Sequence, residues 1–401
     1  MSDALFDQLR AQFQLPEGKI YLDGNSLGAL PQATPGTVAD TVGTQWGQDL
    51  IASWNTHGWI DLPIFVGNQI GKLIGAAEES VVCCDNLSIN LYKAILAGLA
   101  LNPSRREICV EAQQFPSDNY IAAGVAQLLG EERSKINALQ IEEMTPEHLS
   151  DAAVLVLSHV DYKTGSLRDM AKITADAHAA GALVIWDLAH SAGVVDIDVI
   201  ACEVDFAVGC TYKFLNGGPG APGYLFVHPK HSSAVNPISG WMGHAAMFDF
   251  EPSYRPAQGI RRFLTGTQSV LALSAVSAGL KIFDSVAVSD LRARSILLTR
   301  KFIDYLDKSS VASATSVITP RSDDERGSQV SVTLEHAFPI SQALIDNGVI
   351  VDFRAPNIIR FGFSPLYNTP PEAIAAVEAL EDIVREKRYE DPKYKVKSKV
   401  T

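Results

Sequence analysis

Between about residues 80 and 230, short apolar runs alternate with longer amphipathic stretches. The apolar runs are rich in Val, Ile or Leu and flanked by polar residues or Gly, which predicts buried strands over 107–112, 153–158, 183–187 and 204–209. Residues 118–129 and 168–180 have the apolar spacing of helices. Strands alternating with helices predict an α/β fold, with a mostly parallel sheet between layers of helices.

After about residue 285 the pattern changes. Helices predicted over 289–306 and 371–386 bracket short strands at 330–334, 349–353 and 358–363, which is typical of a smaller α+β domain. Another helix is predicted over 34–50. We therefore expect an N-terminal segment, 1–50, that packs with the small domain, a large domain, 51–284, and a small C-terminal domain, 285–401.

The composition fits a globular enzyme, with 47% hydrophobic and 20% charged residues in 401 positions. A net charge of −13 argues against binding to nucleic acid, which is itself a polyanion. No apolar run approaches the roughly 18 to 20 residues of a membrane span. Asp3 and Asp7 stand where a signal peptide needs a basic and then apolar start.

The five cysteines are an odd number without a repeated C-x-x-C pattern, so we expect neither a disulfide framework nor a metal site. A reducing cytoplasm is the location that these features favour. The lysine-rich end, 391–401, is predicted to be a frayed terminus.

The chemistry is expected just beyond the strand ends, where open α/β sheets bind their ligands. Asp187 closes an apolar strand, and a carboxylate buried there needs a cationic partner. A pyridinium nitrogen is one such partner. The alternative is that Asp187 only caps a following helix.

Lys213 follows another predicted strand and precedes the Gly-rich turn 216–220. A desolvated lysine amine is a nucleophile that forms an imine with an aldehyde. The alternative is a lysine that extends from a loop to solvent. Asp187 and Lys213 are 26 positions apart, enough for one connection and one strand. Together they are the minimum set for pyridoxal phosphate (PLP), which needs an imine-forming lysine and an acid for its ring nitrogen.

A phosphate site is predicted at 85–88, where Asp-Asn-Leu-Ser precedes a helix expected over 89–101. The free amides and the dipole at a helix N-terminus attract a dianion. An ordinary helix cap explains the same residues equally well.

Several segments carry a resemblance to a known family. D-x-A-H-x-x-G at 187–193, followed by T-Y-K-F at 211–214, resembles the aminotransferase class V group of fold-type I PLP enzymes. YLDGNSLGALP, QFPSDNY, NGGPGAPGYLFVH, GWMGH, RRFLTGTQSV and RFGFSPLYNT occur in this order and are similar to the kynureninase family. The resemblance runs from residue 21 to about residue 368, nearly the whole chain.

This resemblance implies a role for each matching residue around the cofactor. Leu87 and Ser88 resemble the residues that hold the phosphate through backbone and hydroxyl. Phe115 resembles the aromatic side chain stacked on the pyridine ring. Asp118 and Asp187 resemble the two carboxylates grouped near the ring nitrogen.

The resemblance also implies the catalytic residues Lys213, Tyr212 and Asp187. Lys213 resembles the lysine that forms the imine, and Tyr212 the tyrosine that touches the phosphate and transfers a proton. Ser158 resembles another cofactor contact, and His190 the histidine beside the cofactor.

Trp241 and Thr267 resemble phosphate contacts supplied by a second subunit, which implies a homodimer with active sites at the interface. Arg360 resembles the arginine that pairs with the substrate carboxylate, although a structural ion pair is the alternative. His57 and Ser26 are expected on the substrate side, and His57 could equally serve only to satisfy its loop.

The activity that the resemblance implies is hydrolysis of L-kynurenine to anthranilate and L-alanine, in tryptophan catabolism. Whether the 3-hydroxy form, which yields 3-hydroxyanthranilate, is preferred stays open. The alternative is a cysteine desulfurase or selenocysteine lyase, which shares the fold. Such enzymes need a nucleophilic cysteine after the lysine, and here the last cysteine is Cys210.

Overall fold

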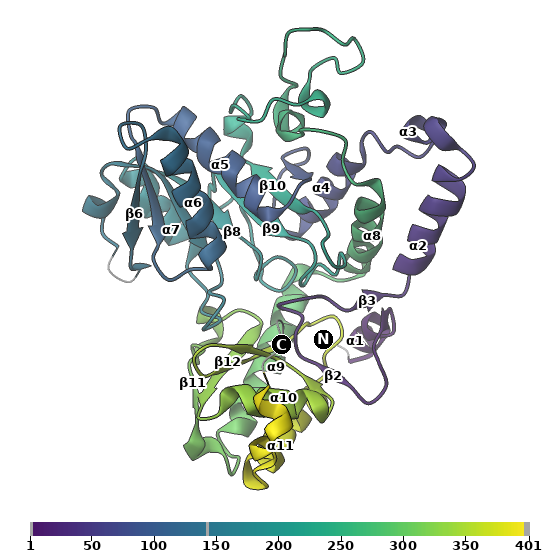
Figure 1. Cartoon of the computed structure of the whole chain (residues 1–401), viewed down its shortest axis with the longest axis vertical. Coiled ribbons are helices and arrows are strands. Elements are labelled where there is room, and N and C mark those ends of the chain that lie inside the picture. The colour runs from purple at the N-terminus through teal and green to yellow at the C-terminus, as the bar shows by residue number, and fades with distance from the viewer. Residues whose placement is uncertain (1–2, 142–143, 397–401) are drawn as a thin grey trace.

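The computed structural model describes residues 3–141 and 144–396. Its largest element is a seven-stranded sheet in the order β4-β10-β9-β8-β7-β5-β6, seen at the centre and left of Figure 1. The strands are β4 (Val81–Cys83), β5 (Glu107–Glu111), β6 (Lys135–Leu139), β7 (Ala152–Ser158), β8 (Leu183–Asp187), β9 (Phe206–Cys210) and β10 (Gly223–Val227).

The strands from β5 to β9 are parallel, as the alternating pattern predicts. Strand β10 is antiparallel to both β9 and β4. The loop 211–222 explains this reversal, because it contains no helix and a parallel return requires a long crossover. The sequence prediction did not include β4, β6 or β10.

Both faces of this sheet are buried. Along β7, Leu155 and Leu157 belong to one apolar cluster and Val154 and Val156 to another, because successive side chains of a strand point to opposite faces. Residues of α4 (Leu62–Leu73), α7 (Met170–Ala179) and α8 (Val270–Leu280) pack into the first cluster, and those of α5 (Leu87–Leu101) and α6 (Pro116–Leu129) into the second. The predicted α/β architecture is confirmed.

A smaller antiparallel sheet lies below the large one in Figure 1, with the strand order β11-β12-β15-β14. Its strands are β11 (Thr315–Val317), β12 (Gln329–Leu334), β14 (Asp352–Arg354) and β15 (Ile358–Gly362). It is covered by helices α9 (Val288–Leu306), α10 (Ala337–Asp346) and α11 (Pro370–Arg385). This confirms the smaller α+β unit, while the boundaries at residues 50 and 284 stay a prediction.

The strand predicted over 349–353 is divided between two sheets. Strand β13 (Val349–Ile350) pairs in parallel with β2 (Ile20–Tyr21), whereas β14 pairs with β15. Strand β2 of the N-terminal segment therefore lies beside the small sheet (Figure 1), and Asp23 forms a bridge with Gly362 of β15.

The helix predicted over 34–50 is interrupted. It consists of α2 (Thr34–Asp40), a π-helical turn (Thr41–Trp46) and a 3-10 turn (Leu50–Ala52), followed by α3 (Ser53–Thr56). Gly43 lies within the π-helical turn and Gly47 directly follows it, and glycine lowers helix stability. Helix α2 lies along α8 of the large sheet's layer.

Part of the predicted frayed end is ordered. Pro392–Lys395 form a 3-10 turn in which the Lys393 ammonium donates to Asp346 at 2.9 Å, so the prediction is wrong for these residues. Residues 397–401 lie outside the described residues. In the described part of the chain no single helix has both the length and the apolarity of a membrane span. The helices Val270–Ser285 and Val288–Leu306 reach that length and apolarity only when they are taken together, across an 88° bend.

Candidate active site

A cavity of about 240 Å³ lies beyond the carboxyl ends of β7 and β8, between the large and small sheets. It is lined by Asn25, Ser26, Leu87, Ser88, Phe115, Ser117, Ser158, Asp187, Ala189, His190, Tyr212, Lys213, Arg354 and Arg360. Most of the residues predicted from the sequence are therefore gathered in one place. Three larger hollows, of 910, 510 and 330 Å³, contain none of the predicted residues; the first two lie near the start of β5 and the third lies beside α9.

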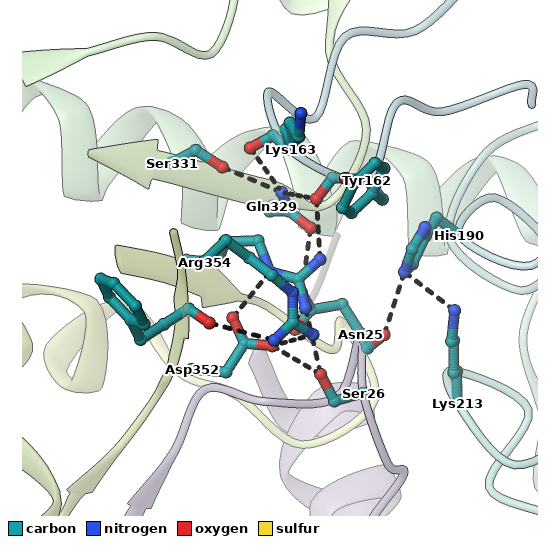
Figure 2. Close-up of polar contacts among 12 residues, drawn as sticks. Asn25, Ser26, Tyr162, Lys163, His190, Lys213, Gln329, Ser331, Asp352 and Arg354 are labelled. Carbon is teal, nitrogen blue, oxygen red and sulfur yellow. Dashed lines mark hydrogen bonds and ion pairs between the residues drawn. The ribbon is translucent and has the colours of Figure 1, made fainter. Parts of the chain in front are cut away.

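Lys213 is held by the turn that follows β9. The Gly28 amide donates to the Tyr212 carbonyl at 2.8 Å, and a Cβ on Gly28 would collide with the Lys213 carbonyl oxygen. The N-terminal motif YLDGNSLG therefore packs directly against the lysine turn, which explains why a glycine stands there. The Lys213 ammonium lies 3.0 Å from His190 Nε2, and among the described residues no carboxylate lies within ion-pair distance of it (Figure 2).

His190 is buried beside the lysine. Its Nε2 also lies 3.1 Å from the Asn25 carbonyl oxygen. Burial, followed by the charges of Lys213 and Arg360, holds the pKa of His190 well below its usual value. The imidazole is therefore neutral at physiological pH, and it contacts the lysine without adding a second cation.

Asp187 and Asp118 form a coupled pair of buried carboxylates. Asp187 Oδ1 accepts from the Ala189 amide at 2.8 Å, while both oxygens of Asp118 are buried without a hydrogen-bond partner among the described residues. Burial and the charge of Asp187 raise the pKa of Asp118 well above its usual value. Burial also raises the pKa of Asp187, although Lys213 opposes it. Apart from the Ala189 amide and the more distant Lys213 ammonium, no donor or cation among the described residues contacts this pair.

The predicted phosphate site lies at the N-terminus of α5. Asn86 caps this helix and accepts from the Ile89 amide at 3.0 Å, so Asn86 is the capping residue. Leu87 and Ser88 are the first two helical residues and line the cavity, and Ser88 Oγ lies 3.2 Å from Ser117 Oγ. Two hydroxyls and the free amides of a 15-residue helix thus converge on one point.

Phe115 and Tyr212 flank the lysine. The Phe115 ring is 42% exposed and packs edge-to-face on Tyr162, with centroids 5.2 Å apart, so one ring face is left open toward the cavity. The charge of Cys210, followed by burial, raises the pKa of Tyr212 far above its usual value. Its phenol therefore keeps its proton throughout the physiological range.

Arg360 is almost fully buried and its guanidinium is held by protein acceptors. Nε donates to Asp352 Oδ1 at 2.6 Å, Nη2 to Asp352 Oδ2 and to Ser26 Oγ at 3.2 Å, and Nη1 to the Tyr162 carbonyl at 2.7 Å. The structural ion pair considered as an alternative is thus present, and Arg360 also lines the cavity.

Three predicted residues lie away from the cavity of their own chain. His57 follows α3 and pairs with Asp49 at 2.7 Å. Trp241, in a 3-10 turn, donates from its indole to the Met247 carbonyl at 2.6 Å, and Thr267 precedes α8. The position of Trp241 and Thr267 outside this cavity is compatible with a role in a second subunit. For His57, the alternative of a residue that satisfies its own loop is the one that these contacts favour.

Comparisons with known proteins bear on this arrangement. A family model described as "Kynureninase C-terminal domain" matches residues 291–380. A kynureninase of Pseudomonas fluorescens is 44% identical over 399 residues, which is 98% of this chain and 96% of that protein. Another, from Burkholderia mallei (strain SAVP1), is 43% identical over 400 residues, with the same coverage. The chain belongs to the kynureninase family. The resemblance indicated by the sequence motifs is confirmed.

Solved structures of similar fold come from a wider group than the kynureninase family. The apo cysteine desulfurase from Thermococcus onnurineus NA1 has a TM-score of 0.80 at 18% identity, and covers 95% of this chain and 98% of its own. A C-DES mutant with glycine covalently linked to its PLP cofactor has a TM-score of 0.80 at 19% identity, covering 93% and 99%. At these identities the likeness concerns the fold, which agrees with the α/β class.

The cavity of this kynureninase-family chain fits PLP on its own geometry. The buried Asp118 oxygens have no hydrogen-bond partner, Lys213 contacts a neutral imidazole, and the α5 N-terminus presents free amides and hydroxyls. A cationic ring nitrogen, an aldehyde and a phosphate are the groups that would satisfy these three features. Among the described residues, no group of three or more His, Cys, Asp or Glu is arranged to hold a metal.

The sequence prediction missed four lining residues: Asn25, Ser117, Ala189 and Arg354. Ala189 lies within the motif D-x-A-H-x-x-G. Asn25 and Ser117 lie within the motifs YLDGNSLGALP and QFPSDNY, so the motifs themselves were the available signal. Arg354 had no local signal, because its place at the cavity depends on how β14 pairs with β15.

Proposed function

We propose that this chain is a PLP-dependent kynureninase, which hydrolyses L-kynurenine to anthranilate and L-alanine. The observation that carries the proposal is a single cavity, in a kynureninase-family chain, that contains an imine-forming lysine, a carboxylate and a guanidinium. Each of these groups matches one part of an amino acid bound to PLP.

The residues that would hold PLP are those whose hydrogen-bonding groups or ring faces are not fully used within the protein. Ser88, Ser117 and the first amides of α5 would bind the phosphate, and the open face of Phe115 would pack on the ring. Asp187, supported by Asp118, would accept from the ring nitrogen. When bound, PLP supplies an aldehyde for amines and a protonated ring that withdraws electrons from the substrate Cα.

Two side chains near the reacting atoms can move protons. The Lys213 amine, when it is not engaged by the cofactor, would be able to accept the proton from the substrate Cα. Tyr212 keeps its phenolic proton at neutral pH and lines the same cavity, so it can donate to a carbanion that forms next to it. Neutral His190 lies 3.0 Å from the lysine amine and helps to orient it.

Substrate recognition belongs to the wall formed by the small sheet. Arg360 is proposed to pair with the α-carboxylate, and Ser26, which accepts from Arg360 Nη2 at 3.2 Å, lies on the same side. His57 would take part only if it reached a cavity other than that of its own chain.

A cysteine desulfurase is the rival with the same fold. It requires a reactive cysteine after the lysine, and here all five cysteines precede Lys213. Burial raises the pKa of Cys83, Cys84, Cys109 and Cys210, which disfavours their thiolate forms. These features favour the hydrolase.

The test uses purified protein loaded with PLP and supplied with L-kynurenine, 3-hydroxykynurenine or L-cysteine in separate reactions. Anthranilate fluorescence and alanine are expected in equal amounts from kynurenine, and neither from Lys213→Ala. Release of sulfide from cysteine, without anthranilate from kynurenine, would assign the chain to the rival class.

We further propose that the active unit is a homodimer, with Trp241 and Thr267 reaching the partner's phosphate site. Trp46, Leu50 and Ile51 on the segment after α2 are more than half exposed, as is Phe250 near Trp241. Such gathered apolar side chains are typical of surfaces that another protein covers. Sedimentation at assay concentration should give twice the chain mass, and a fully active monomer would contradict the proposal.

We also propose a cytoplasmic location, which the free state of all five cysteines supports. Division of the chain into a large PLP-binding domain over 51–284 and flanking segments over 1–50 and 285–401 remains part of the same proposal. Limited proteolysis followed by mass spectrometry would locate the boundaries.

A further inference from the structure

Two guanidinium groups, not one, face the substrate side of the cavity. Strand β14 carries Asp352 and Arg354, and the neighbouring antiparallel strand β15 carries Arg360. The register pairs Asp352 with Arg360, and Arg354 is two positions further along β14. Because side chains two positions apart share one face of a sheet, all three side chains lie on the same face.

Most donors of Arg360 are already used by the protein. A guanidinium has five N–H groups, and those of Arg360 that donate to Asp352, Ser26 and the Tyr162 carbonyl account for four of them. The side chain is 2% exposed. A carboxylate that approaches Arg360 alone finds one unused N–H, on Nη1, and cannot form two parallel bonds without displacing a protein acceptor.

Arg354, unlike Arg360, is partly exposed and has several unused hydrogen-bond donors. Its side chain is 33% exposed, its Nη2 lies 2.9 Å from Asp352 Oδ2, and its Nη1 donates to the Phe353 carbonyl at 3.0 Å. Its Nε has no protein acceptor among the described residues, and the side chain lines the same cavity as Lys213. Figure 2 shows Arg354 and Asp352 on one side of this region and His190 and Lys213 on the other, with Asn25 between them.

The charges of this wall are unequal. Asp352 is the carboxylate that contacts both guanidinium groups, so it neutralises one of two cations. Asp23 lies close by, but burial and the charge of Asp352 raise its pKa to about 7, so it is largely protonated in mildly acidic solution. The wall then carries one uncompensated positive charge beside the cavity, which matches a single carboxylate.

We propose that Arg354 is a specificity-determining residue that binds the α-carboxylate of the amino-acid substrate together with the unused N–H of Arg360. Asp352 is the positioning residue that holds both guanidinium groups in register. This inference rests on the proposed function for the identity of the substrate, but it applies to any α-amino acid bound at Lys213. The inference predicts that the cavity binds amino acids with a free α-carboxylate much more tightly than their neutral carboxamides.

The test compares a change in the protein with a change in the substrate. Arg354→Met keeps the apolar stem and removes the charge, and Arg354→Lys keeps the charge and removes the planar fork. Each variant, loaded with PLP, is assayed on L-kynurenine and on its neutral α-carboxamide. Inhibition constants for L-alanine and L-alaninamide give a second readout that needs no turnover of the carboxamide.

For Arg354→Met, kcat/KM on L-kynurenine should fall roughly thirty-fold or more, mainly through KM, because a desolvated charged pair is lost. The inhibition constant of L-alanine should rise by a similar factor. The values for carboxamide and alaninamide should change less than about three-fold, since the missing charge has no partner there. Arg354→Lys should fall between wild type and Arg354→Met.

A purely structural role gives a different result. If Arg354 only supported Asp352, the acid and amide ligands would weaken equally, and this outcome would overturn the inference, as would unchanged constants. Arg321→Met is the matched control, because Arg321 forms an exposed ion pair with Asp307 and neither residue lines the cavity. If wild type bound L-alanine but did not hydrolyse kynurenine, the proposed function would fail while the alanine data still decided the role of Arg354.

Discussion

The two walls of the cavity differ in how their charges are balanced. The wall from the large sheet carries Lys213 and Asp187, with Asp118 fully buried next to Asp187; the Asp118 oxygens have no hydrogen-bond partner among the described residues, and the lysine contacts a neutral histidine. The wall from the small sheet carries Asp352, Arg354 and Arg360, which are joined by direct ion pairs. One wall leaves its charged groups unsatisfied, and the other satisfies most of them internally.

This difference shows which wall depends on a ligand for its stability. A buried carboxylate without a partner is costly, so the large-sheet wall gains when a ligand brings a ring nitrogen and a phosphate. The small-sheet wall holds its guanidinium groups before any substrate arrives, so little ordering is needed on binding. The large-sheet wall is thus suited to a permanent cofactor and the small-sheet wall to a substrate that enters and leaves.

The largest expected effect follows from Lys213→Ala. Loss of the amine that accepts the Cα proton should lower turnover by about 10²–10⁴-fold or more, while the phosphate and ring contacts still hold PLP. Absorbance, cofactor content after gel filtration, and mass spectrometry after borohydride reduction give the three readouts. A PLP adduct on the reduced variant would remove Lys213 from this role.

The second expected effect concerns the stability of the small-sheet wall. Asp352→Asn leaves Arg360 buried without its counter-ion, which typically costs about 3–5 kcal/mol of unfolding free energy. Asp307→Asn is the control, because its exposed pair with Arg321 should contribute only about 0–1 kcal/mol. Urea unfolding of both variants measures the difference. Equal losses of unfolding free energy in the two variants would mean that the buried ion pair contributes no more to stability than the exposed one.

The third prediction is that removing a carboxylate from the large-sheet side stabilises the protein, whereas removing Asp352 from the small-sheet wall destabilises it. The pKa of Asp118 is raised in the folded protein, so the folded state binds the proton more tightly than the unfolded state, and stability falls as pH rises above about 4. Asp118→Asn removes this loss and should stabilise the cofactor-free protein by about 1–3 kcal/mol at pH 8. The gain should shrink toward pH 4 and disappear when PLP is bound. Destabilisation at pH 8 would refute the comparison of the two walls.

The smallest effect is expected at Asp23, whose pKa is raised to about 7 by burial and by Asp352, while Ser26 and the two arginines oppose the shift. Wild type should lose stability between pH 4 and 7, because the folded state holds a proton that the unfolded state has released. Asp23→Asn should lack this part of the pH dependence, with a gain that is only a fraction of that for Asp118→Asn. Thermal unfolding at pH 5 and pH 8 measures it; parallel shifts of both proteins would contradict the assignment.

Much of the large-sheet wall could be predicted from the sequence. Asp187 and Lys213 each follow a short apolar run, and the predicted strand 183–187 coincides with β8. Strand β9 is Phe206–Cys210, so the strand predicted over 204–209 began two residues early and ended one residue early. Local hydrophobic pattern was sufficient here, because the end of a buried parallel strand decides where the next polar residue lies.

The reversed direction of β10 and the division of the strand predicted over 349–353 were not predictable in this way. Strand β10 is as apolar as the parallel strands of the same sheet, and its own residues do not indicate its direction. The segment 349–353 reads as one apolar run, but β13 pairs with β2 more than 300 positions earlier in the chain, whereas β14 pairs with β15. Pairings between distant segments depend on the assembled core and not on local pattern.

The sequence by itself determined the family and the α/β class, and it indicated the residues that we propose meet the cofactor, because these depend on local motifs and on strand ends. Only the tertiary structure placed Asn25, Asp352 and Arg354 beside Ser26 and Arg360, the two residues of the small-sheet wall that the sequence had indicated. Asn25, Ser26, Asp352, Arg354 and Arg360 come together through contacts between the N-terminal segment and the small sheet. The charged residues lie on neighbouring strands, whereas Asn25 and Ser26 come from more than 300 positions earlier, and hydrogen bonds and ion pairs depend on distance in space and not along the chain.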